Sequence, residues 1–158
     1  MGRTMNIYEK KLIKIFNECD KHILRINSAT KKMSNFMELY EDKFINLSED
    51  EIEHIDQFLF RFSKLQDAMG QKLFKTMLVY LNEDIEGKAF IDILNIMEKL
   101  YLIEDANDWK ELREDRNELA NNYDDDPEGT SKAINKLYNK KDVLINIYQT
   151  IKANYENR

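Results

Sequence analysis

Arg116 is the residue of this sequence whose chemistry is hardest to explain by packing alone. It falls on the apolar stripe of a predicted helix, which also carries Trp109, Leu112, Leu119, Ala120 and Tyr123. A guanidinium keeps its charge, so a core-facing position costs free energy unless the side chain meets an anion or a partner chain. The stretch around Arg116 is therefore the first place to look for function.

Two interpretations of Arg116 stay open at the level of sequence. One is that the guanidinium meets an anion or a partner chain, which makes Arg116 a candidate for an anion-binding or interface site. The other interpretation is an ion pair with Asp67 or another neighbour in the same chain, since buried charges need partners.

Residues 116–128 and a segment upstream resemble a known family. The matching positions are Arg116, Asn117, Leu119, Ala120, Tyr123, Asp125, Asp126, Pro127 and Glu128. They are similar to the HepT-like branch of the HEPN family, all-helical RNase toxins often paired with a minimal nucleotidyltransferase antitoxin. Phe62-Ser-Lys-Leu-Gln-Asp67 and Gly70-Gln-Lys-Leu-Phe74 are similar to the same branch. The resemblance covers most of the chain.

The resemblance implies a function and a role for each matching residue. It implies a metal-independent endoribonuclease without a cofactor, a homodimer that cleaves RNA at a site shared by its two copies. Arg116 would hold the phosphate and Asn117 would support the site. Asn121 stands where the family carries its catalytic histidine. Tyr123 is the expected acceptor of the AMP groups with which the antitoxin blocks the RNase.

Asn121 is where the sequence departs from the family pattern. Imidazole accepts and donates protons near neutral pH, as attack by the RNA 2′-hydroxyl requires, whereas a carboxamide does not titrate there. Asn121 is either an inactivating substitution, made so that a toxic protein could be produced, or the mark of a naturally degenerate member. The sequence therefore predicts an inactive or weakened RNase toxin. The alternative is a non-catalytic helical partner of a nucleotidyltransferase, in which Arg116 serves only an interface.

The spacing of Arg116 and Asn121 adds a geometric constraint. Five residues apart, the two side chains project about 140° from each other on an ideal α-helix. One straight helix cannot aim both at the same phosphate. Either the helix loosens near Asn121, or the site is composed across two chains.

An all-α, up-and-down bundle of about five helices is predicted to position these residues. Apolar residues at steps of three and four predict helices over about 5–40, 48–81, 88–100, 106–123 and 127–155. Ser48 and Glu51 form a capping-box pattern, and Asp126 with Pro127 marks a helix start. Gly70 costs about 1 kcal/mol relative to alanine inside a helix, which indicates a close helix crossing.

Composition and charge limit the class of protein. The 158 residues, with four glycines, one proline and one cysteine, predict a single domain (1–158) of long helices with Cys19 as a buried thiol. A net charge of −6 argues against a generic nucleic-acid coat but leaves room for a local basic site. Without a membrane-length apolar run or a signal peptide, the protein is expected to be soluble and cytoplasmic.

Remaining ionisable groups are weaker candidates. His22 and His54 lie far from Arg116 in sequence and do not have the spacing to replace a catalytic histidine. The lysines at 10, 11, 14, 132, 136 and 140 fall on polar helix faces. Such lysines are usually solvated, and here they are also candidates to extend an RNA track beside the motif.

Overall fold

The protein is helical throughout the part that the structure describes. The computed structural model describes residues 5–122 and 125–158, and no strand occurs among them. The helices are α1 (Ile7–Met33), α2 (Glu41–Ile45), α3 (Glu49–Ala68), α4 (Phe74–Tyr80), α5 (Phe90–Lys99), α6 (Ala106–Asn122) and α7 (Pro127–Glu156). A π-helical turn, η1 (Met69–Leu73), joins α3 to α4 without a break. The predicted all-α class is confirmed.

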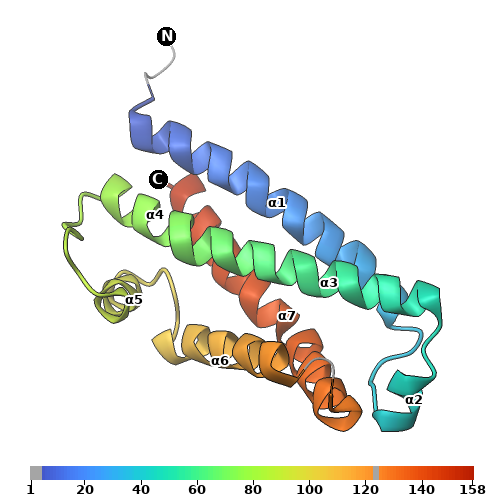
Figure 1. Ribbon diagram of the computed structural model, residues 1–158. Helices are drawn as coiled ribbons and strands as arrows, with labels where there is room; N and C mark the ends of the chain where they lie inside the picture. The colour runs from blue at the N-terminus through green and yellow to red at the C-terminus, as the bar shows by residue number, and fades with distance from the viewer. Residues whose placement is uncertain (1–4, 123–124) are drawn as a thin grey trace.

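The long helices run up and down the molecule (Figure 1). α1 runs one way, α3–η1–α4 returns alongside it, α6 reverses direction again, and α7 runs back toward the end where the chain begins. α1 packs along α3, and α6 packs along α7. α5 is seen nearly end-on in Figure 1, so it lies across the bundle between α4 and α6. The helical bundle is thus as predicted, with one helix set crosswise.

The helix starts predicted from capping residues are confirmed for α3 and α7. Ser48 and Glu51 make both bonds of the capping box at the start of α3. The Asp126 side chain accepts from the Gly129 N–H, and Pro127 occupies the first turn of α7. These caps use only neighbouring residues, which is why the sequence reveals them.

The predicted end of the first helix at residue 40 is wrong. α1 ends at Met33, and the chain turns before the short helix α2, which the sequence did not predict. Phe36 and Leu39 are both buried in this turn, so apolar residues continue past the helix end. The Asn135 amide of α7 accepts from the Leu39 N–H and donates to its carbonyl, both at 2.8 Å. A distant side chain therefore holds the turn.

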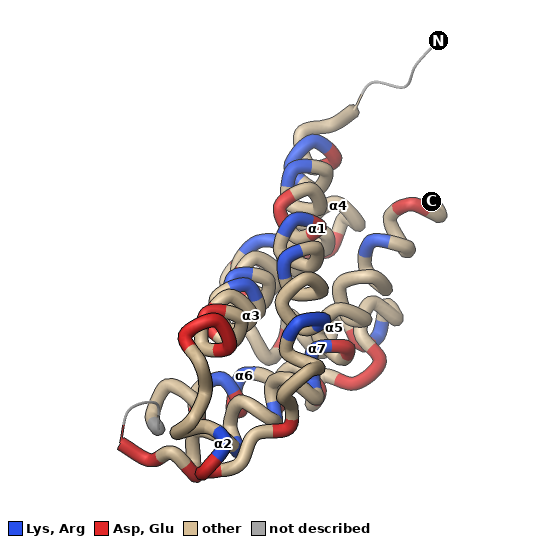
Figure 2. Tube along the Cα trace, turned by 90° about the vertical axis from the view of Figure 1, so that its right-hand side faces the viewer, with Lys and Arg blue, Asp and Glu red and all other residues tan. Residues whose placement is uncertain are grey.

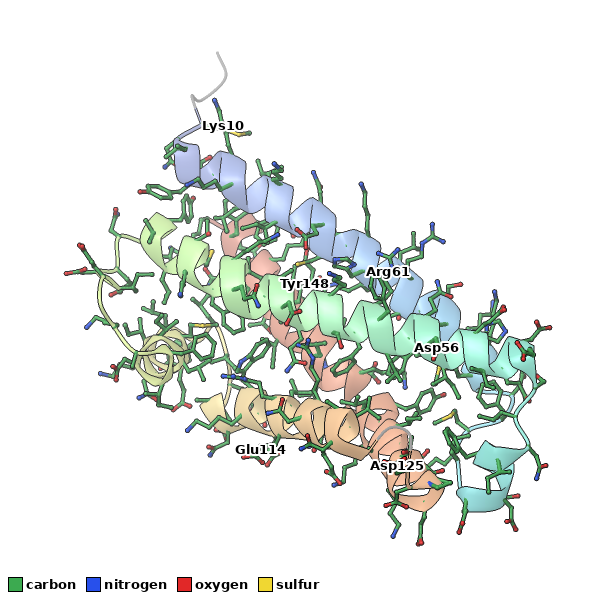
Figure 3. All side chains as sticks on the ribbon, viewed as in Figure 1. Lys10, Asp56, Arg61, Glu114, Asp125 and Tyr148 are labelled. Carbon is green, nitrogen blue, oxygen red and sulfur yellow. The ribbon has the colours of Figure 1, made fainter. Side chains whose placement is uncertain are left out.

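Lys, Arg, Asp and Glu residues occur on every long helix among the described residues (Figure 2). In Figure 3, Lys10 and Glu114 point away from the bundle while Tyr148 lies between its helices. The buried Tyr148 hydroxyl lies 2.7 Å from Asp20 Oδ1 and 3.0 Å from the Phe16 carbonyl.

In the described part of the chain, no helix is both long and apolar enough to cross a membrane.

Cys19 is fully buried on α1, as predicted. Burial raises the pKa of its thiol to about 12, with the neighbouring carboxylates of Glu18 and Asp20 adding to the effect. Because the thiolate is the reactive form, we expect Cys19 to react very slowly with a disulfide reagent at pH 8 in the native protein and rapidly in guanidinium. Reaction at the unfolded rate without denaturant would contradict the packing of α1.

Candidate functional site

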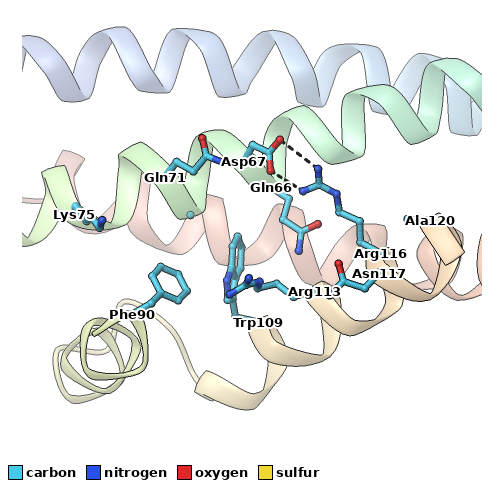
Figure 4. A pocket seen from close by; sticks show the side chains of 11 residues that line it. Gln66, Asp67, Gln71, Lys75, Phe90, Trp109, Arg113, Arg116, Asn117 and Ala120 are labelled. Atoms are coloured by element: carbon cyan, nitrogen blue, oxygen red, sulfur yellow. Dashed lines mark hydrogen bonds and ion pairs between the residues drawn. The ribbon is translucent and has the colours of Figure 1, made fainter. Parts of the chain in front are cut away.

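A groove of about 600 Å³ lies between α3–η1 and α6 (Figure 4). From α3 and η1 it is lined by Gln66, Asp67, Gly70 and Gln71. From α6 it is lined by Trp109, Arg113, Arg116, Asn117 and Ala120, with Lys75 and Phe90 at one end. A groove of this size is in the range of small-molecule sites.

Three acidic residues of α6, Glu111, Asp115 and Glu118, face α7. Lys140 Nζ lies 2.9 Å from Asp115 Oδ2 and 3.2 Å from Glu111 Oε2, and Lys136 Nζ lies 2.9 Å from Glu118 Oε2. The bond to Asp115 is the first cause that raises the pKa of Lys140. Positions 111, 115 and 118 follow helical spacing, so all three carboxylates lie on one face. Lys136 and Lys140 are thus paired with carboxylates of α6, and neither lines the groove.

The opposite face of α6 is cationic. Arg113 and Arg116 line the groove, and Lys75 of α4 joins them. Asp67 is the only carboxylate among the described lining residues. A chain with a net charge of −6 therefore carries a groove with an excess of positive charge, and such a local field attracts anions.

Arg116 forms a two-pronged ion pair with Asp67. Its Nη1 donates to Oδ1 at 2.6 Å and its Nη2 donates to Oδ2 at 3.3 Å. The intrachain ion pair considered from the sequence is thus present. About a third of each side chain is exposed, and a pair in such a setting contributes roughly 0–1 kcal/mol. A guanidinium has five N–H donors, so donors remain for an anion in the groove.

Gln66 and Trp109 carry buried polar atoms without partners. Gln66 is 3% exposed and Trp109 is 2% exposed. Within the described chain, neither amide atom of Gln66 nor the indole N–H of Trp109 makes a hydrogen bond. Figure 4 shows the Gln66 amide extending from α3 toward α6, between Arg116 and Trp109. An unpaired buried polar group costs about 1–3 kcal/mol, so this arrangement requires an explanation.

Gln66 is not among the site residues predicted from the sequence, although the sequence carries a signal for it. Gln66 lies four residues after Phe62 and three before Met69, and both of these residues are buried. It is therefore a polar residue at a core position of the helix. That mismatch is the same kind of signal that drew attention to Arg116.

Gly70 marks a close helix crossing, as predicted. A Cβ at this position would lie 2.9 Å from Cζ2 of Trp109, whose ring packs edge-on against Phe74. We expect Gly70→Ala to lower the free energy of unfolding by about 1–3 kcal/mol, because overpacking outweighs the gain in helix propensity. Urea unfolding measures this change. In a Trp109→Phe background, Gly70→Ala should lower the free energy of unfolding by less. An equal loss in both backgrounds would mean that the indole does not cause the overpacking.

The other predicted site residues are only partly brought together. Asn117 is exposed and lines the groove beside Arg116, whereas Asn121 is exposed and does not line it. α6 continues as an α-helix through Asn122, so it does not loosen to aim Asn121 at the groove. Tyr123 lies outside the residues that the structure describes. Within one chain, Arg116 lines the groove and Asn121 does not.

Neither histidine lines the groove. His22 of α1 lies 3.4 Å from Glu18 Oε2 and 3.1 Å from an Arg61 nitrogen, and burial lowers its pKa. His54 is half-buried on α3. α1 packs on the side of α3 away from α6, so its lysines also lie away from the groove (Figure 1).

The site thus combines cations, an aromatic wall and an unpaired amide. Phe74 stacks on Phe90 and meets Trp109, which ties α4, α5 and α6 together at one end of the groove. Positive charge beside aromatic faces is the combination that binds nucleotides of single strands. Comparisons of the chain with protein-family models, with curated proteins and with solved structures find no match.

Proposed function

We propose that this chain is a HEPN-type endoribonuclease subunit whose groove between α3–η1 and α6 holds RNA phosphate, and whose cleavage is limited by Asn121. One observation carries the proposal: the Arg116 fork, oriented by Asp67, lies in a cationic groove of an otherwise acidic protein. An oriented fork loses less freedom when it binds phosphate, which favours such a role.

The proposed reaction is attack of the RNA 2′-oxygen on the adjacent phosphorus. The bond from phosphorus to the 5′-oxygen breaks, which leaves a 2′,3′-cyclic phosphate and a 5′-hydroxyl. Arg116 neutralises the charge that develops on the phosphate oxygens. Asn121 can hydrogen-bond a phosphate but cannot move the proton of the 2′-hydroxyl, which costs about 100- to 10,000-fold in rate.

A homodimer is part of the proposal. Because α6 stays helical, Arg116 and Asn121 of one chain diverge, and a second copy would supply the missing side of the site. The resemblance of residues 62–74 and 116–128 supports two further elements. These are a nucleotidyltransferase antitoxin as partner and Tyr123 as its AMP acceptor.

RNA binding to the groove is the first test of this proposal. We expect labelled single-stranded RNA to bind with an affinity that falls as salt rises, and Arg113→Ala to weaken binding several-fold. Lys136→Ala is the matched control, since it removes one positive charge from α7 outside the groove. Fluorescence anisotropy at two salt concentrations measures both.

Two results would contradict the proposal. Equal losses in the Arg113 and Lys136 variants would show that only net charge matters. Failure of the unmodified chain to bind any RNA would favour the second candidate function, a non-catalytic partner of a nucleotidyltransferase. The observations that favour this alternative are that Arg116 already has a partner and that Asn121 cannot titrate.

A further inference from the structure

Gln66 is a buried polar side chain whose amide is not used in the packing of the described helices through any hydrogen bond. It is almost fully buried on α3, and its amide makes no hydrogen bond within the described residues. Methionine has a similar volume and carries no amide to leave unpaired. Keeping a buried donor and acceptor side by side makes physical sense if a ligand offers a complementary acceptor and donor.

The surroundings of Gln66 fit a planar, phosphorylated ligand. The half-buried Phe90 provides aromatic surface, and the buried indole N–H of Trp109 beside it is a further unpaired donor. The Arg113 guanidinium lies 5.8 Å from the centre of the Phe90 ring, so charge stands directly beside this surface. Arg116 provides a second cation in the groove.

We propose that the groove binds an adenine nucleotide and that Gln66 recognises the base. The 6-amino group of adenine would donate to Gln66 Oε1 while a neighbouring ring nitrogen accepts from Nε2, the pairing that carboxamides make with adenine. Guanine presents two adjacent acceptors on its N7/O6 edge and suits arginine instead. The inference rests on the proposed function, since it names the nucleotide that the RNA groove prefers.

The base must reach an amide at the floor of the groove. Both amide atoms of Gln66 are covered, so side chains above them must move apart on binding. Arg113 and Asn117 line the groove and are exposed, so they can move without disturbing the core. Binding is therefore expected to change the environment of Trp109, the single tryptophan of the chain.

Trp109 fluorescence tests the inference directly. The unmodified protein is titrated with AMP, with GMP, with inorganic phosphate, and with the RNA pentamers UUAUU and UUUUU. We expect UUAUU to bind at least about tenfold more tightly than UUUUU, as one bidentate base contact implies, and AMP to bind more tightly than GMP or phosphate. Gln66→Met should remove this adenine preference, so that UUAUU and UUUUU bind the variant equally well.

Thermal stability separates recognition from a structural role. Because Gln66→Met removes two unpaired buried polar atoms, we expect the Tm to rise by about 2–4 °C or more. Gln57→Met is the matched control, on the same helix but outside the groove, and should change neither the Tm nor the preference. A Tm lowered by Gln66→Met, with preference intact, would show a structural role and overturn the inference.

The two pentamers distinguish a failure of adenine recognition from a failure of the proposed RNA function. If UUAUU and UUUUU bind equally well, the groove binds RNA and adenine recognition is wrong. If AMP binds tightly and neither pentamer binds, the occupant is a free adenine nucleotide, so recognition by Gln66 stands and the RNA function falls. If no nucleotide binds, both are wrong.

Discussion

Asn121→His is expected to raise the rate of RNA cleavage by about 100- to 10,000-fold over the unmodified chain, the usual contribution of a general acid–base group. The change supplies a proton acceptor at the position where the resembling family carries its histidine. Cleavage of end-labelled RNA in the presence of EDTA measures the rate, and a 2′,3′-cyclic phosphate end identifies the mechanism. Expression of the variant should also arrest growth.

The effect should be specific to position 121. Asn121 is exposed, so imidazole fits there with little cost, and surface changes are usually within about 0.5 kcal/mol of neutral. An exposed histidine has a pKa near 6.5, so the gained activity should fall as pH drops below about 6. Asn107→His is the matched control at the start of α6, and equal activation by this variant would contradict the assignment.

Arg116→Ala is expected to weaken RNA binding at least about tenfold while lowering the free energy of unfolding by about 1 kcal/mol or less. The ion pair with Asp67 is partly exposed, so its loss costs the fold little, whereas the phosphate loses its oriented partner. Anisotropy and urea unfolding measure the two effects on the same preparation.

The Asp67 side of the pair refines this test. Asp67→Asn weakens the orientation of Arg116 but also removes the negative charge of Asp67 from the groove. These effects oppose each other in RNA binding, so we expect binding to change little and cleavage in the Asn121→His background to fall. For Arg116→Ala, the contradicting result would be a large loss of stability with unchanged RNA binding. It would show that Arg116 is a structural residue.

The features predicted from the sequence are those that neighbouring residues determine. The capping box at Ser48 and the start of α7 at Asp126 depend on residues within one turn, and Gly70 marked its crossing because glycine is costly in a helix. The end of α1 at Met33 depends instead on burial of the following turn and on Asn135, far away in sequence. No local pattern contains that information.

The candidate site also has features that the sequence predicts and features that depend on the fold. Arg116 and its possible partner Asp67 were identified, because a charge on an apolar stripe is visible in sequence. The separation of acidic and basic faces on α6 depends on which helix packs against which side, and it emerged only from the fold. Asn121 does not line the groove, and its distance from Arg116 depends on how α6 packs, which the sequence pattern does not show.

Subunit mixing tests the central claim most directly, because it asks whether Arg116 and residue 121 act together across two chains. The Asn121→His/Arg116→Ala variant is expected to be silent alone. Mixed with the unmodified chain, it should regain part of the cleavage shown by Asn121→His, since one copy then supplies arginine and the other supplies histidine. Cleavage by Asn121→His alone with a silent mixture would contradict action across two chains, and silence of both on a broad pool of RNA would contradict the RNase account.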